Sequence, residues 1–175
     1  MSSIEIQKGE LAEAVESFAR LISSLDEKTF LGPLGRWSAR DVVAHLIGWN
    51  RYTVQGARQI LRGELPFYDV DPGEDYANVN RTHLREYPSL VMDELLVELR
   101  ASARELSETL SALDPNTWRR DFGVRHKGQT VTIRSTVDDL ITDYAHHAEQ
   151  IRGLDLLPRV EPGVAGSEEP RDRTP

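Results

Sequence analysis

Four long stretches of the chain carry apolar residues at alternating spacings of three and four, and this pattern limits the possible folds more than any other feature. Such spacing places the apolar side chains on one stripe of an α-helix. The stretches run from about Ile4 to Leu25, from Ser38 to near Gly63, from Ser89 to Leu113, and from Ser135 or Thr136 to about Leu154. Four amphipathic helices of this length predict an all-α domain, a four-helix bundle.

The connections between these helices predict its topology. Residues Glu64 to Glu74 contain two prolines and a glycine and form a connection long enough for a crossover between non-adjacent ends. Asp75 to Tyr87 should add a short extra helix, ended by Pro88. Arg119 to Arg134 mixes β-branched residues with two glycines and predicts an irregular loop with a short hairpin before the last helix.

Composition limits the classes of protein. We expect one domain over residues 1–157 and a disordered polar tail over residues 158–175. No run reaches the roughly 20 apolar residues of a membrane helix, and the first residues lead us to expect no signal peptide. The absence of cysteine excludes disulfides and thiolate sites, and a cytoplasmic location is expected. A net charge of −8 argues against binding to nucleic acid.

Three residues at the edges of the apolar stripes suggest a metal site. On the last helix, His147 lies at the edge of the apolar arc with Asp143 one turn before it, whereas His146 points to solvent. On the second helix, His45 lies on the flank of the arc, one turn before Trp49. Two imidazoles and one carboxylate would leave coordination positions open for water or substrate, as in catalytic metal sites.

The spacing alone leaves other interpretations open. A histidine at the edge of a core is more often a hydrogen-bonded structural residue, and Asp143 with His147 would also make an ordinary ion pair on a helix surface. His83 and His126 have no partners at ligand spacing, so we predict that they do not bind metal.

Other conspicuous residues have structural explanations. Trp37 and Trp49 are expected in the core or in a pocket wall, and Trp118 as a plug at the end of the bundle. Asp138 and Asp139 are expected in the first turn of the last helix, where the helix dipole favours carboxylates.

The segment RWSARDVVAHLIGWNRY, with HxxQI in the last helix, resembles the DinB-like (DinB/YfiT-like) superfamily of metalloenzymes over roughly Leu11 to Leu154. In that superfamily one histidine of the second helix and an HxxxH pair of the last helix hold the metal. His45 matches the first ligand and His147 the second residue of the pair. Asp143 replaces the other histidine, at a place where the similar mycothiol-dependent maleylpyruvate isomerases carry Glu.

The resemblance implies a cofactor, a pocket and an assembly. The cofactor would be one divalent transition metal, Zn, Ni, Fe or Mn, bound by His45, Asp143 and His147. The substrate would be a small molecule in a pocket at the end of the bundle, walled by Trp49 and Tyr52. Members of the superfamily are often dimeric, so a homodimer is expected.

Three functions remain open from the sequence. The first is a metal-dependent hydrolase or thiol-dependent transferase or isomerase, in which metal-activated water or thiol attacks a small electrophile. The second is a metal-free self-resistance or binding protein for a toxic natural product, because the stretch from Trp37 to Asn80 resembles the ClbS/DfsB branch of the superfamily. The third is an interaction scaffold, favoured if side chains fill the end of the bundle.

Overall fold

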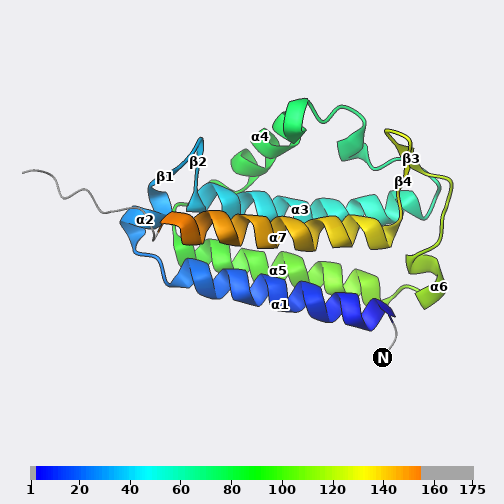
Figure 1. Cartoon of the computed structure of the whole chain (residues 1–175), viewed down its shortest axis with the longest axis horizontal. Helices are drawn as coiled ribbons and strands as arrows, with labels where there is room; N and C mark the ends of the chain where they lie inside the picture. The colour runs from blue at the N-terminus through cyan, green and yellow to red at the C-terminus, as the bar shows by residue number, and fades with distance from the viewer. Residues whose placement is uncertain (1–2, 155–175) are drawn as a thin grey trace, which may run out of the picture.

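The computed structural model describes residues 3–154, and the predicted tail over residues 158–175 lies outside the described residues. Its four long helices are α1 (Ser3–Ser23), α3 (Ala39–Ile60), α5 (Met92–Ser111) and α7 (Ile133–Leu154). Both α5 and α7 pack against α1 and against α3, so that α1 and α3 lie on opposite corners of the bundle. The prediction of an all-α four-helix bundle is confirmed (Figure 1).

The chain crosses over between α3 and α5. Figure 1 shows that these two helices run in the same direction, so the connecting chain must return along the length of the bundle. On this path lie two short 3-10 helices, η1 (Phe67–Asp69) and η2 (Glu74–Tyr76), and the helix α4 (Ala77–Glu86). Because α4 packs against α3, the crossover covers the outer side of that helix. The predicted crossover and extra helix are both present.

The residue that caps each long helix sets where the helix begins. Ser38, where the second apolar stretch was expected to begin, caps α3: its hydroxyl accepts from the Asp41 amide at 3.2 Å, and the Asp41 carboxylate accepts from the Ser38 amide at 2.9 Å. The third helix was expected to begin at Ser89, and this was wrong, because the Ser89 hydroxyl accepts from the Val91 amide two residues later and forms a turn. As a result α5 begins at Met92.

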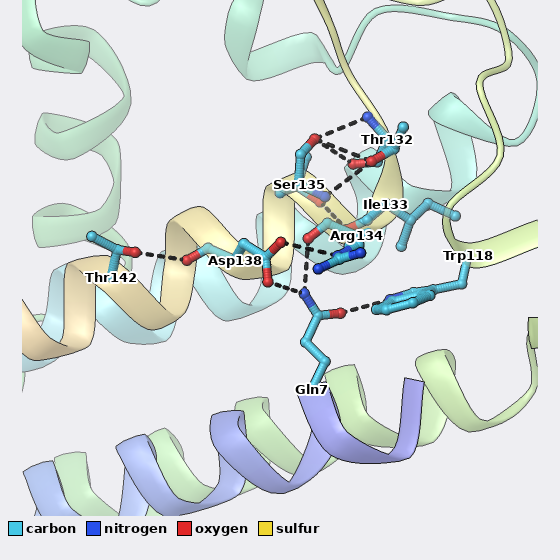
Figure 2. Close-up of polar contacts among 9 residues, drawn as sticks. Gln7, Trp118, Thr132, Ile133, Arg134, Ser135, Asp138 and Thr142 are labelled. Atoms are coloured by element: carbon cyan, nitrogen blue, oxygen red, sulfur yellow. Dashed lines mark hydrogen bonds and ion pairs between the residues drawn. The ribbon is translucent and has the colours of Figure 1, made fainter. Parts of the chain in front are cut away.

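The last helix begins earlier than predicted, at Ile133. Thr132 is its cap, because the Thr132 hydroxyl accepts from the Ser135 amide and the Ser135 hydroxyl accepts from the Thr132 amide, each at 3.0 Å (Figure 2). Asp138 and Asp139 therefore lie in the second turn, and the first turn holds no acidic residue. The dipole explanation for these two carboxylates was wrong.

Short elements complete the ends of the bundle. The helix α2 (Glu27–Leu31) precedes a hairpin of β1 (Pro33–Leu34) and β2 (Trp37–Ser38), and neither was expected. The helix α6 (Pro115–Trp118) precedes a second hairpin of β3 (Arg125–His126) and β4 (Gln129–Thr130), in the loop where a hairpin was predicted.

The predicted apolar stripes form the core. Most of their side chains are buried, and those at the helix ends are partly buried. The buried members include Leu11, Val15, Phe18, Ile22, Val42, Val43, Leu46, Ile47, Val54, Leu95, Leu99, Leu106, Leu110, Val137, Leu140, Tyr144 and Ile151. Each stripe occupies one side of its helix. In the described part of the chain, no helix is long and apolar enough to cross a membrane.

One buried amide joins three helices at the end of the bundle where α7 begins. Gln7 of α1 is 3% exposed and donates to the Arg134 carbonyl at 2.9 Å and to the Asp138 carboxylate at 2.6 Å. Its carbonyl accepts from the Trp118 indole at 2.6 Å (Figure 2). Trp118 is 1% exposed, so it closes this end of the core as predicted, with its single donor satisfied.

Candidate metal centre

The three predicted ligands lie together because α3 and α7 pack side by side. His45 Nε2 lies 2.9 Å from Asp143 Oδ2, and His147 Nε2 lies 3.4 Å from Asp143 Oδ1. One donor atom of each residue lies within 4.8 Å of the other two. The histidines are 5% and 7% exposed, whereas the Asp143 side chain is 34% exposed. The cluster is therefore held by the helices and open on one side.

A hydrogen bond to Asn80 fixes the protonation of the first imidazole. The Asn80 amide nitrogen donates to the Asp75 carbonyl at 3.2 Å, so its amide oxygen is the atom that faces His45 Nδ1, at 3.0 Å. An amide oxygen only accepts, and therefore Nδ1 of His45 carries a proton. In the neutral ring the lone pair is then on Nε2, the atom beside Asp143.

Gln150 acts in the same way on the second imidazole. Its amide nitrogen lies 2.8 Å from His146 Nε2, and its oxygen lies 2.8 Å from His147 Nδ1. His147 therefore also presents Nε2 to Asp143. Hydrogen bonds from the remote nitrogen to an oxygen are typical of histidines that bind metals, because they orient the ring and select the tautomer.

The electrostatics favour a neutral imidazole beside a charged carboxylate. Burial lowers the pKa of His147, and the charge of His45 adds to this effect against the attraction of Asp143. Burial acts to raise the pKa of Asp143, but the hydrogen bond with His45 and the nearby imidazoles outweigh it, so this pKa is lowered. At neutral pH the cluster holds an ionised carboxylate and the neutral form of His147, as metal ligation requires.

The spacing of the donor atoms also fits a metal ion. Ligands bound about 2.1 Å from an ion lie about 3.0 Å apart at a right angle and about 3.4 Å apart at the tetrahedral angle. His45 Nε2 lies 2.9 Å from one oxygen of Asp143 and His147 Nε2 lies 3.4 Å from the other, which falls in this range. Nitrogen and carboxylate donors suit Zn, Ni, Fe and Mn. Within residues 3–154, no other group of three His, Asp or Glu residues has its donor atoms this close.

A cavity of about 1250 Å³ opens beside the cluster. It runs along the groove between α3 and α7, between the two hairpins and beneath the crossover, and all three cluster residues line it. The resemblance led us to expect the pocket at the end of the bundle, but it lies along the side. The reason is that the crossover and the hairpins, rather than the helix ends, enclose the space.

The aromatic residues around the cluster have different roles. Trp49 lines the cavity, whereas Tyr52, expected beside it, lies behind the wall with its ring 4.4 Å from that of His83. Trp37 is carried by the first hairpin. Its ring centroid lies 5.9 Å from that of His147, in a stacked arrangement, and 4.9 Å from that of His45. Its ring shields one side of both imidazoles.

The other histidines lie outside the cluster. His146 is exposed, as expected. His83 is fully buried and neither of its ring nitrogens has a hydrogen-bond partner, so burial, followed by the charge of His45, lowers its pKa to about 3. His126 lies in the second hairpin with Nδ1 3.9 Å from Asp69.

Sequence reasoning missed the two residues that orient the imidazoles. Gln150 was detectable, because it lies three residues after His147 and therefore on the same helix face. Asn80 was not, because only the path of the crossover brings α4 to His45.

The chain is a four-helix bundle with one long crossover, and the three candidate donors lie between its second and last long helices. The sequence matches the mycothiol maleylpyruvate isomerase N-terminal domain over residues 11–152, and the chain belongs to that family. The resemblance seen in the sequence is thereby confirmed. No curated protein matches the chain at a significant level.

Solved structures share the fold at low sequence identity. A Streptococcus pneumoniae protein is 12% identical with a TM-score of 0.73, over 90% of this chain and 93% of its own. An uncharacterized protein from Clostridium difficile 630 is 11% identical with a TM-score of 0.73, over 90% and 98%. The colibactin self-resistance protein ClbS, in complex with a dsDNA, is 15% identical with a TM-score of 0.71, over 89% and 96%.

Proposed function

We propose that this chain is a metal-dependent enzyme that acts on a small electrophilic molecule, as a hydrolase or as a thiol-dependent transferase or isomerase. One divalent transition metal would be held by His45, Asp143 and His147. The observation that carries the proposal is the convergence of the Nε2 atoms of His45 and His147 on the Asp143 carboxylate at the edge of a large cavity. Without a cation or added protons, these electron-rich atoms would repel one another.

The residues around the cluster would each contribute to the reaction. A bound metal supplies Lewis acidity, which lowers the pKa of a water or thiol in its open position. Asn80 and Gln150 hold the two imidazoles in the required tautomer. Trp37 covers both rings and excludes water from that side. The partial exposure of Asp143 toward the cavity leaves the approach for substrate.

The test is a titration of the apoprotein with Zn²⁺ and Ni²⁺ by isothermal calorimetry. His147→Ala should weaken binding by at least about a hundredfold, since it removes one of three ligands. His146→Ala is the matched control: it removes an adjacent exposed histidine and its hydrogen bond to Gln150 but no ligand, and it should change affinity by less than about tenfold. Equal effects of the two substitutions would refute the assignment.

The second candidate is a metal-free binding or self-resistance protein for a toxic natural product. It is favoured by the fact that protonated imidazoles would satisfy Asp143 without a metal. ClbS, a structural neighbour, is described as a self-resistance protein. If the double variant of His45→Ala and His147→Ala retains ligand binding or activity, this candidate is correct; loss of both supports the metal enzyme.

Three further expectations stay predictions. A cytoplasmic location and a homodimer remain to be tested by fractionation and by light scattering. The ClbS structure contains dsDNA, but a net charge of −8 disfavours phosphate binding by this chain. We expect no shift of a DNA duplex in an electrophoretic assay at physiological salt.

A further inference from the structure

We propose that the cavity contains a second recognition site, about one helical turn from the metal ligands, that binds an organic ammonium group. Two carboxylates and three aromatic rings form it: Asp69, Asp139, Trp49, Tyr68 and Tyr76. All five residues line the cavity.

Neither carboxylate has a Lys or Arg partner within 4 Å among the described residues, and Asp69 has only a histidine beside it. The Asp69 side chain is only 8% exposed, and its carboxylate accepts one hydrogen bond, from the Tyr76 hydroxyl at 2.8 Å. The nearest basic group is His126, whose Nδ1 is 3.9 Å away. Asp139 is an exposed residue of α7 that lines the cavity, and partial desolvation, followed by the charges of Asp138 and Asp69, raises its pKa. One buried and one exposed carboxylate, neither paired with Lys or Arg, give this part of the cavity a preference for a positive ligand.

Three aromatic rings surround the same space. The Trp49 ring lies 5.2 Å from that of Tyr68 and 5.4 Å from that of Tyr76, and both contacts are edge-to-face. Rings set at right angles to each other form the walls of a box, and the faces of such rings attract ammonium groups. Carboxylates combined with an aromatic box favour an alkylammonium over a bare metal ion, which would lack sufficient oxygen ligands here.

An unpartnered hydroxyl on a buried residue of the cavity wall is an independent indication of a ligand. Tyr68 is only 7% exposed, yet its hydroxyl makes no hydrogen bond with any residue of the described chain. The ring fits because Gly56 has no side chain: a Cβ there would lie 2.6 Å from the hydroxyl oxygen. Burial, followed by the charges of Asp69, Tyr76 and Asp139, raises the pKa of Tyr68, so its hydroxyl lies within the field of both carboxylates. An ammonium N–H would supply the missing donor.

The position of this site indicates what kind of substrate the proposed enzyme would bind, and this inference rests on the proposed function. Asp139 precedes Asp143 by four residues on α7, about 6 Å along the helix axis. Trp49 follows His45 by one turn on α3. The substrate would therefore be a small amine whose electrophilic centre lies roughly one helical turn from its nitrogen.

The test uses the full-length, metal-free, ¹⁵N-labelled protein and benzylamine as the probe at neutral pH. Each of the three tryptophans gives its own indole N–H resonance, and the Trp49 resonance is assigned as the one that disappears in Trp49→Phe. Benzylamine should shift the Trp49 resonance and leave that of Trp118, which is enclosed at the end of the bundle, unchanged. Benzyl alcohol, the neutral isostere, should bind at least about tenfold more weakly. Equal binding of the alcohol would overturn the proposal.

Matched substitutions locate the charge. Asp139→Asn should weaken benzylamine binding by about tenfold, whereas Asp138→Asn, which changes the neighbouring residue bound to Gln7, should change it by less than about twofold. Asp139 has no partner to lose, so its variant should unfold at the wild-type midpoint. Equal effects of both variants would refute the site. Amine binding without metal binding would disprove the proposed function alone.

Discussion

Replacing Gly48 with alanine is expected to force α3 and α4 apart. A Cβ at this position would lie 2.2 Å from Cγ, 2.3 Å from Cδ2 and 2.6 Å from Nδ1 of His83, against 3.4–4 Å for ordinary contact. His83 is fully buried, with its ring 4.4 Å from that of Tyr52 and 5.4 Å from that of Trp49. The imidazole therefore cannot rotate away, and α4 must move by about 1 Å or more.

The magnitude follows from two opposing terms. Overpacking of this kind costs about 1–3 kcal/mol, and a clash with a ring atom inside 2.5 Å belongs at the upper end. Replacing glycine by alanine inside a helix returns about 1 kcal/mol. Gly48→Ala should therefore lower the free energy of unfolding by about 1–2 kcal/mol. Asn80 is one turn before His83 on α4, so the affinity for metal should fall as well.

Urea unfolding followed by circular dichroism measures this change. Gly9→Ala is the control, because no atom lies within 4 Å of the added Cβ, and it should raise stability by about 0.5–1 kcal/mol. In a His83→Ala background the clash is absent, so adding Gly48→Ala should stabilise the protein by about 1 kcal/mol. If Gly48→Ala is as stable as wild type, or if its effect is unchanged without His83, the reasoning is refuted.

Three further substitutions test other parts of the structure. His83→Phe should flatten the pH dependence of the free energy of unfolding. Since the folded pKa of His83, about 3, lies below the usual 6.5, the wild-type protein should lose about 2 kcal/mol between roughly pH 8 and pH 5 as the unfolded chain takes up a proton. If the free energy of unfolding falls equally with pH in both proteins, this explanation is contradicted. Gln150→Ala should weaken metal binding by about ten- to a hundredfold in calorimetry with no change in the unfolding midpoint, and unchanged affinity would exclude its orienting role. Gln7→Leu should cost about 2–3 kcal/mol in urea unfolding, because the Trp118 indole and the Arg134 carbonyl lose their partner; a loss below about 1 kcal/mol would show that they find another.

The bundle was predictable because its information is local. Each apolar stripe is carried by a single helix, and the residues at its centre are buried as the spacing requires. Helix starts were less predictable because a hydroxyl can accept from a backbone amide in a turn as readily as at a helix cap. Ser89 forms a turn instead of a cap, and Thr132 caps the helix that was expected to begin at Ser135 or Thr136.

The site was predictable only in part, since its halves come from distant segments. The relation of Asp143 to His147 follows from one helix, whereas the approach of His45 depends on how α3 packs against α7. Asp139 received a structural explanation only because the start of its helix was placed too late. The position of the cavity depends on the path of the crossover, for which the local sequence carries no pattern.

The metal content of the purified protein tests the central proposal most directly. The protein would be loaded separately with Zn²⁺, Ni²⁺, Fe²⁺ and Mn²⁺, desalted, and analysed by plasma mass spectrometry beside the double variant of His45→Ala and His147→Ala. The convergence of His45, Asp143 and His147 predicts about one equivalent of at least one of these ions per chain, and less than about a tenth in the variant. Less than about a tenth of an equivalent of every ion in the wild-type protein would contradict the proposed metal centre.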